Sequence, residues 1–210
     1  TREKGRLPAF LLLVSALVGL VVLEPDLGTG SILFGIALVL YFLSGAAVGQ
    51  FLLLIPVAGI IFGMLALTSP YRLQRVMTFL NPESDPLGSS YQIRQAIISL
   101  GSGGVFGVGL GRSRQKYEYL PEANTDSIFA ILGEEMGFIG AITVIGLYAA
   151  LISRIFRIGK HASGEKAQLF VYAIGSWIGL QTLINVASMA ALFPLTGVPL
   201  PLISYGGSNL

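Results

Sequence analysis

Long apolar segments, separated by short polar stretches, constrain the fold of this chain more than any other feature. Each of several runs holds about 17 residues, which as a helix with a rise of ~1.5 Å per residue reaches roughly 26 Å. Polar flanks and glycines extend these helices toward the ~30 Å hydrocarbon core of a bilayer. Hydrophobic residues make up 53% of the sequence and charged residues 11%, whereas a soluble domain carries about a quarter charged residues. The sequence therefore predicts an all-α integral membrane protein, a polytopic bundle of transmembrane helices.

The predicted bundle is a single membrane domain over residues 1–210, with a large extracytoplasmic loop that contains short helices. Five full spans are expected at about 7–23, 28–44, 51–67, 134–154 and 167–192, with the start of another from about 203 and the external loop at 68–133. Basic residues precede the first span and separate the fourth from the fifth: Arg2, Lys4, Arg6, Arg154, Arg157, Lys160 and Lys166. If all five helices cross, both groups lie on one side, which we predict to be cytoplasmic because short cytoplasmic loops are rich in Lys and Arg.

The composition excludes several classes of function. A net charge of +2, without a basic stripe, argues against nucleic-acid binding. The absence of cysteine excludes disulfides and thiolate metal sites, and His161 alone cannot supply a histidine-based metal site. Glycines crowd residues 101–111, but no register gives G-x-G-x-x-G and no G-K-[ST] follows. We therefore expect neither a nucleotide nor a haem, and we interpret these glycines as allowing a re-entrant loop to pack tightly.

A polar stretch from Lys116 to Asp126 carries three carboxylates beside the predicted membrane, where charged groups usually mark a functional site. Thr125 is predicted to be the N-cap of the helix that leads into the fourth span, with Asp126 in the first turn. The helix dipole would then favour the ionised form of Asp126. Two interpretations remain: a simple cap, or a general base that must come within ~3 Å of the proton it removes. Helical periodicity places Asp126 on one face with four small residues, Ala130, Gly133, Gly137 and Gly140.

Glu118 and Glu122 precede Asp126 closely enough to share a pocket with it. If two of these carboxylates approach each other, like-charge repulsion raises the pKa of one. Alternatively they hold a divalent cation, Mg²⁺ or Mn²⁺, with Glu118 and Asp126 as the candidate ligands. A third possibility is a solvated acidic loop. For Glu134 and Glu135 we favour packing or dipole roles.

Four cations, Arg72, Arg75, Arg94 and Lys116, lie in the predicted external loop. They are candidates for binding the phosphates of a lipid head group and for stabilising a departing pyrophosphate. Simple attraction to anionic lipids is the alternative. Between the first two spans, Asp26 is predicted to cap the second helix, with contact to metal or substrate as the alternative.

Six motifs, in order, resemble the SEDS family (shape, elongation, division and sporulation), which includes FtsW, RodA and SpoVE. They are Glu24–Gly30 (EPDLGTG), Gly103–Gly111 (GGVFGVGLG), Ser113–Lys116 (SRQK), Tyr119–Asp126 (YLPEANTD), Gly133–Gly140 (GEEMGFIG) and Pro199–Ser208 (PLPLISYGGS). The YLPEANTD form, together with GEE, is closer to FtsW and SpoVE than to RodA. Because members of the family have more transmembrane helices, the chain is expected to be the C-terminal half of a longer protein.

The resemblance implies a peptidoglycan glycosyltransferase, facing outward from the bacterial cytoplasmic membrane, that polymerises lipid II. Its expected partners are undecaprenyl-pyrophosphate-linked glycan, a class B penicillin-binding protein and other division or elongation membrane proteins. The family's essential aspartate matches Asp126, which would deprotonate the acceptor's 4-hydroxyl for inverting attack on an anomeric carbon. Residues expected to contact substrate are Arg72, Arg75, Arg94, Lys116, Glu118 and Glu122. Two alternatives remain: a flippase or transporter of lipid-linked precursor, and a non-catalytic division scaffold.

Overall fold

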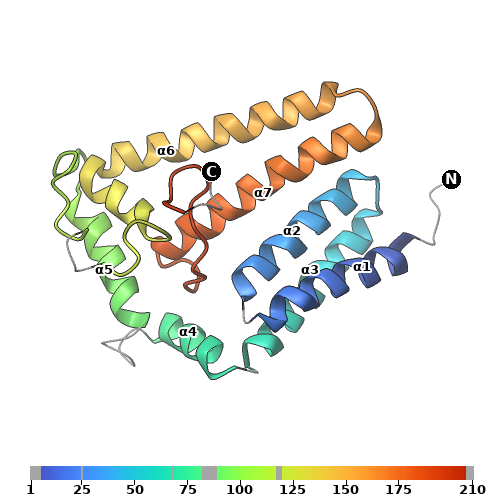
Figure 1. The fold of residues 1–210 in the computed structure, drawn as a ribbon, viewed down its shortest axis with the longest axis horizontal. Helices are drawn as coiled ribbons and strands as arrows, with labels where there is room; N and C mark the ends of the chain where they lie inside the picture. The colour runs from blue at the N-terminus through green and yellow to red at the C-terminus, as the bar shows by residue number, and fades with distance from the viewer. Residues whose placement is uncertain (1–5, 25, 68, 82–88, 117–119, 207–210) are drawn as a thin grey trace. The chain divides into compact units, whose positions relative to one another are not determined.

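The computed structural model describes residues 6–24, 26–67, 69–81, 89–116 and 120–206 (Figure 1). Over these residues the chain is helical and contains no strand, so the predicted all-α class is confirmed. The helices are α1 (Arg6–Leu23), α2 (Leu27–Leu43), α3 (Val48–Leu67), α4 (Pro70–Leu80), α5 (Ser89–Ser102), α6 (Ile128–His161) and α7 (Glu165–Met189).

Three of the described helices, α3, α6 and α7, are long and apolar enough to cross a membrane. Two shorter apolar helices occupy residues 8–23 and 27–43, where the first two spans were predicted. That these two shorter helices also cross stays a prediction. Large apolar side chains such as Leu12, Leu52 and Ile60 are exposed on α1 and α3, as expected for helices surrounded by hydrocarbon rather than water.

Several helix boundaries differ from the predicted spans, and α6 runs to His161, beyond the predicted end near 154. Helix α6 begins at Ile128, ahead of the predicted start near 134, and α7 ends at Met189, short of 192. Ala191 has a φ of 53°, which a continuing right-handed helix does not allow. Residues 201–206 form turns and a bend where another span was expected to begin. Gly137, with φ 67° and ψ −168°, interrupts α6, so the small-residue face predicted along this helix is not continuous.

The chain forms two compact units, residues 1–67 with 152–180, and residues 68–151 with 181–210. Apolar contacts hold the first unit together. Tyr41 clusters with Leu38 and Leu54 and stacks on Phe10 with ring centroids 4.4 Å apart. Asp26 accepts a hydrogen bond from the backbone N–H of Thr29 at 3.0 Å, which confirms the predicted cap of α2.

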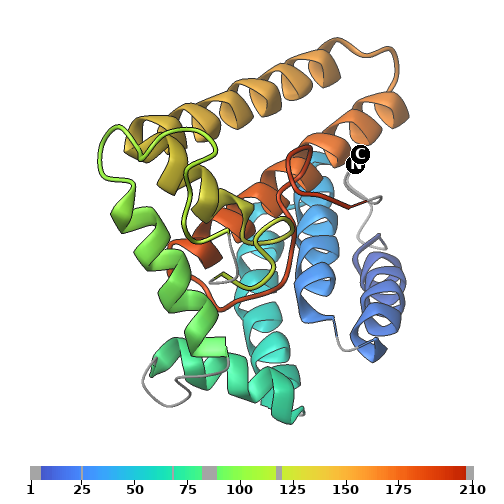
Figure 2. The same ribbon diagram turned by 60° about the vertical axis from the view of Figure 1, so that its left-hand side comes forward.

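The second unit contains α4, α5, the first part of α6, the last part of α7 and the irregular chain after α7. The prediction of short helices within residues 68–133 is confirmed by α4 and α5. The chain that follows α5 lies against the first turns of α6 (Figure 2). A Cβ atom at Gly103 would lie 2.1 Å from the carbonyl oxygen of Gly133, so the prediction that glycines allow close packing here is confirmed.

Candidate active site

Asp126 lies in a tight turn immediately before α6. The carbonyl oxygen of Glu122 accepts hydrogen bonds from the backbone N–H groups of Thr125 and Ser127, both at 3.1 Å. Glu122 has a φ of 53°, which closes the turn. The hydroxyl of Thr125 donates back to the Glu122 carboxylate at 2.7 Å rather than accepting from the helix. The predicted N-cap at Thr125 is therefore wrong: α6 begins at Ile128, and Asp126 precedes it.

The Asp126 carboxylate is largely shielded from solvent, with 7% of the residue's surface exposed. Gln92 of α5 donates from Nε2 to Asp126 Oδ2 at 3.4 Å and to the Ser127 hydroxyl at 3.1 Å. Burial raises the pKa of Asp126 above 3.8, although the Gln92 hydrogen bond and the Arg75 charge act in the opposite direction. Relative to a solvated carboxylate, the site therefore disfavours the ionised form of Asp126, opposite to the effect expected from the helix dipole, because the cost of burying the charge exceeds the stabilising contributions.

The irregular chain after α7 holds this turn from the other side. Asn185 donates from Nδ2 to two carbonyl oxygens, that of Asp126 at 2.7 Å and that of Val198 at 2.8 Å. The Ser204 hydroxyl donates to the Thr125 carbonyl at 2.5 Å, and the Tyr205 N–H donates to the Asn124 carbonyl at 2.8 Å. The backbone around the carboxylate is thus fixed by segments far apart in the sequence.

Sequence reasoning missed three of these supporting residues, Gln92, Asn185 and Ser204. Asn185 had a usable signal, since an asparagine within an apolar helix is costly to bury and usually has a specific partner. For Gln92 the only sequence signal was its position on an amphipathic helix. Nothing local in the sequence indicates that Ser204 reaches the turn before α6, because that contact depends on the fold.

The three predicted arginines occupy different environments. Arg75 of α4 donates to the Leu195 carbonyl at 3.0 Å and to the Tyr71 hydroxyl, and its guanidinium lies 4.7 Å from the Tyr71 ring centroid. Its charge also acts on Asp126. Arg72 is buried on the same helix, whereas Arg94 is exposed on α5. Of these arginines, Arg75 is the one with an identified electrostatic effect on the Asp126 carboxylate.

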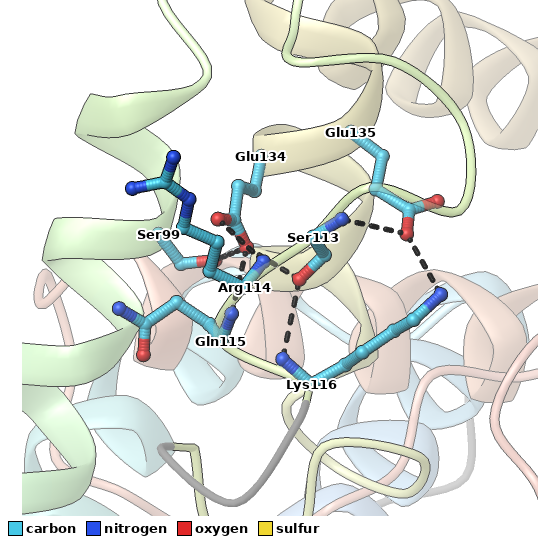
Figure 3. A network of polar contacts seen from close by, with 7 residues as sticks. All are labelled: Ser99, Ser113, Arg114, Gln115, Lys116, Glu134 and Glu135. Atoms are coloured by element: carbon cyan, nitrogen blue, oxygen red, sulfur yellow. Dashed lines mark hydrogen bonds and ion pairs between the residues drawn. The ribbon is translucent and has the colours of Figure 1, made fainter.

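Lys116, the fourth predicted cation, is engaged by α6. Its Nζ forms an ion pair with Glu135 Oε1 at 3.2 Å (Figure 3). The same carboxylate oxygen accepts from the backbone N–H of Ser113 at 3.4 Å. Glu135 of α6 thus holds the chain between α5 and α6 against that helix. Its partner Lys116 is one of the residues that the sequence predicted to bind substrate.

Glu134 is the centre of the polar network in Figure 3. Only 2% of its surface is exposed, and its carboxylate accepts from the hydroxyls of Ser113 at 2.5 Å and Ser99 at 3.4 Å. It also accepts from the backbone N–H groups of Arg114 at 3.1 Å and Gln115 at 3.4 Å. A buried carboxylate with this many donors joins α5, α6 and the intervening chain.

The predicted divalent-cation site stays a prediction, because one of its two candidate ligands, Glu118, lies outside the described residues. The described residues contain no group of three or more His, Cys, Asp or Glu side chains able to hold a metal ion. Glu122, whose carboxylate accepts from Thr125, is exposed.

The family model for cell cycle proteins of the FtsW, RodA and SpoVE type matches residues 1–210. The chain belongs to this family. It is 49% identical to the probable peptidoglycan glycosyltransferase FtsW of Coxiella burnetii over 205 residues, covering 95% of this chain and 55% of that protein. It is 43% identical to stage V sporulation protein E of Bacillus subtilis, covering 99% of this chain and 57% of that protein. The chain therefore spans about half the length of these relatives.

Solved structures of family members share the fold. A chain of a peptidoglycan synthase complex that coordinates polymerization and crosslinking matches with a TM-score of 0.70 and 29% identity, over 96% of this chain and 56% of that one. Thermus thermophilus RodA, a rod shape determining protein, matches with a TM-score of 0.63 and 26% identity, over 100% of this chain and 53% of RodA. Together with the long apolar helices, family membership makes the chain part of a multi-pass membrane protein.

Proposed function

We propose that the protein containing this chain is a peptidoglycan glycosyltransferase that polymerises lipid II on the outer face of the bacterial cytoplasmic membrane. The relatives named as probable peptidoglycan glycosyltransferases support this activity. The match to a chain of a peptidoglycan synthase complex supports action together with a partner enzyme, for which we propose a class B penicillin-binding protein. The observation that carries the proposal is the buried Asp126 carboxylate, held in the turn before α6 with its pKa raised.

In the proposed reaction, Asp126 removes the proton from the 4-hydroxyl of the acceptor lipid II. The oxygen attacks the anomeric carbon of the lipid-linked glycan, the carbon–oxygen bond to the pyrophosphate breaks, and undecaprenyl pyrophosphate leaves with inversion at the sugar. A carboxylate with a raised pKa is a stronger base than an exposed one, which favours proton transfer. Gln92 restrains the carboxylate through its hydrogen bond to Oδ2.

The leaving pyrophosphate requires positive charge or hydrogen-bond donors. Guanidinium groups suit phosphate because they donate in a planar fork, and donors placed where charge develops lower the barrier. Arg75 is our first candidate, since its charge already acts at Asp126, with Arg72 and Arg94 as further candidates. A divalent cation remains a prediction, and we assign it no step.

The test is polymerisation of purified lipid II by the whole protein with its partner, comparing wild type with Asp126→Asn. We expect the variant to bind lipid II and to make no glycan strand, because the amide cannot accept the proton. Glu165→Gln is the matched control: it removes an exposed carboxylate from the first turn of α7 and is expected to leave polymerisation unchanged.

Three outcomes would contradict the proposal. Undiminished polymerisation by Asp126→Asn would remove this residue from the mechanism. A wild-type protein that makes no polymer but moves lipid-linked precursor across a vesicle membrane would be a transporter instead. A wild-type protein that does neither, with its partner and a divalent cation supplied, would be a scaffold.

A further inference from the structure

The kink in α6 breaks two helical hydrogen bonds, and the glycine-rich chain before it replaces both. In an uninterrupted helix the carbonyls of Glu134 and Glu135 would accept from the N–H groups of Phe138 and Ile139. Here Glu134 O accepts from Val108 N and Glu135 O from Gly109 N, both at 3.0 Å.

The donors freed by the kink are paired as well. Phe138 N donates to Gly104 O at 2.9 Å, and Ile139 N donates to Val105 O at 3.2 Å. All four backbone groups released at Gly137 thus bond to residues 104–109. We call residues 104–111 the glycine loop.

Close backbone packing seats the glycine loop directly on the kink. A Cβ at Gly107 would lie 2.2 Å from the carbonyl oxygen of Glu135, and one at Gly137 would lie 2.3 Å from the backbone nitrogen of Gly107. No side chain fits between the two segments. The glycine loop therefore lies at the same depth in the membrane as residues 134–139.

The length of α6 places that depth inside the bilayer. From Gly137 to Arg154, the first charged residue along the helix after the kink, about 17 residues rise roughly 26 Å. With Arg154 at one boundary of a ~30 Å hydrocarbon core, Gly137 lies short of the opposite boundary. Non-helical backbone at membrane depth occurs where protein supplies its hydrogen bonds, as the glycine loop does here.

The side chains of the glycine loop match this position. Phe106 is 82% exposed and Leu110 is 76% exposed, although both are large and apolar. The surface continues onto α6, where Phe138 is 62% exposed and Ile142 is also exposed. Residues 102–111 carry no charge, and the next residue, Arg112, is exposed, as expected where a membrane-buried segment meets the head groups.

We propose that the glycine loop is a lipid-inserted anchor, in which Phe106 and Leu110 enter the leaflet opposite the Arg154 end of α6. Its ligand is the acyl-chain region of the bilayer, with Arg112 at the level of the lipid phosphates. The anchor would fix the depth of the chain between α5 and α6, which carries Ser113 and the Lys116 ion pair to α6. This inference does not depend on the protein being an enzyme.

The experiment measures where single side chains sit in the whole protein, reconstituted in lipid nanodiscs. This chain has no cysteine, so a spin label at Phe106→Cys or Leu110→Cys is unique once any cysteine elsewhere in the protein is replaced. Power saturation compares collisions with oxygen, which partitions into lipid, and with a nickel chelate, which stays in water. We expect oxygen collisions to exceed nickel collisions at both sites.

Matched labels calibrate the result. Ile142→Cys reports the lipid-facing side of α6, and His161→Cys reports its exposed polar end. Labels at 106 and 110 that behave like 142 support the anchor. Two results overturn it: nickel access like that at 161 means that the loop lies in water, and low access to both reagents means that another protein surface covers it. Phe106→Trp, quenched by brominated lipid tails, gives a second reading if the cysteine variants fail to fold.

Discussion

Two aspartates, Asp26 and Asp126, occupy similar places in the sequence and different places in the structure. Each precedes a long apolar helix and each is preceded within a few residues by proline. Asp26 is exposed and accepts from Thr29 N at 3.0 Å, so it caps α2. Asp126 is buried, and α6 does not begin until Ile128.

The difference lies in what each carboxylate is bonded to. A carboxylate oxygen of Asp26 accepts a hydrogen bond from the first turn of α2. This bond stabilises the helix and occupies that oxygen. Asp126 receives only long contacts from the described side chains, from Gln92 at 3.4 Å and Thr125 at 3.5 Å. An ionised carboxylate can accept about four hydrogen bonds, so Asp126 keeps capacity for a proton donor from a substrate. A buried carboxylate that its own helix does not use is the better candidate for chemistry.

The largest expected effect contrasts the two aspartates directly. Asp126→Asn should lower lipid II polymerisation by roughly 10²–10⁴-fold, the usual contribution of a general base. Asp26→Asn should leave the rate near wild type, because asparagine caps a helix about as well as aspartate. Initial rates of glycan synthesis by the whole protein with its partner measure both. Equal losses in the two variants would mean that Asp126 acts only on structure.

The pH dependence of polymerisation tests the same carboxylate without a mutation. A base acts in its ionised form, and burial raises the pKa of Asp126 above 3.8. Activity should therefore fall, about tenfold for each pH unit below the raised pKa, at a higher pH than a carboxylate of ordinary pKa would give. The acid limb of kcat/KM against pH measures this, and the residual activity of Asp126→Asn should lack that limb. An acid limb retained in the variant would belong to another group.

Glu134 extends the comparison to a buried carboxylate whose bonding capacity is filled. Glu134→Leu leaves the Ser113 hydroxyl and the N–H groups of Arg114 and Gln115 without this acceptor, and each buried group left unpaired costs roughly 1–3 kcal/mol. We expect a large drop in thermal stability in detergent and faster amide exchange at 114 and 115. Glu165→Gln, which changes an exposed carboxylate, should alter neither. Unchanged exchange at 114 and 115 would contradict the role of Glu134 as the centre of the network.

Much of the helical architecture follows from the sequence, because apolar runs and amphipathic periodicity are local signals. They predicted the helices at α1–α3, α4 and α5, and the acidic residue before an apolar run predicted the Asp26 cap. The same cap pattern failed at Thr125, where the Glu122 carbonyl accepts the turn's N–H groups and burial outweighs the helix dipole at Asp126. The pattern cannot distinguish these cases, because burial depends on residues far away in the chain.

The support around the candidate site was the least predictable part. Gln92, Asn185 and Ser204 reach the turn of Asp126 from α5, from α7 and from the irregular chain after α7. No spacing rule connects such distant positions in a single sequence. The kink at Gly137 was missed for a related reason: glycine in an apolar helix more often permits close packing than a break, and the glycine loop decides which occurs.

A smaller effect is expected at Asn185, which bonds the backbone on the C-terminal side of Asp126. Asn185→Leu removes donors to the Asp126 and Val198 carbonyls, which are left unpaired at a cost of about 1–3 kcal/mol. Thermal unfolding should detect this loss. Polymerisation measured well below the unfolding temperature should fall mainly in kcat, because the proposed base is displaced while the arginines proposed to bind substrate stay in place. A rise in KM alone would instead place Asn185 in substrate binding.

The smallest expected effect separates the two aspartates by their contribution to helix stability. Asp26→Ala removes the acceptor at the start of α2 and should lower the free energy of unfolding by about 1 kcal/mol, whereas Asp26→Asn should leave it almost unchanged.

At Asp126, where no helix depends on the side chain, Asp126→Asn should be at least as stable as wild type at neutral pH. A raised pKa means that the folded state disfavours the ionised carboxylate, so its stability cost grows as the pH rises above 3.8 toward the folded-state pKa. Unfolding temperatures of the variants at acidic and neutral pH measure this difference. If Asp126→Asn destabilises the protein as Asp26→Ala does, the Asp126 carboxylate supports the fold as a cap would, and the distinction between the two residues fails.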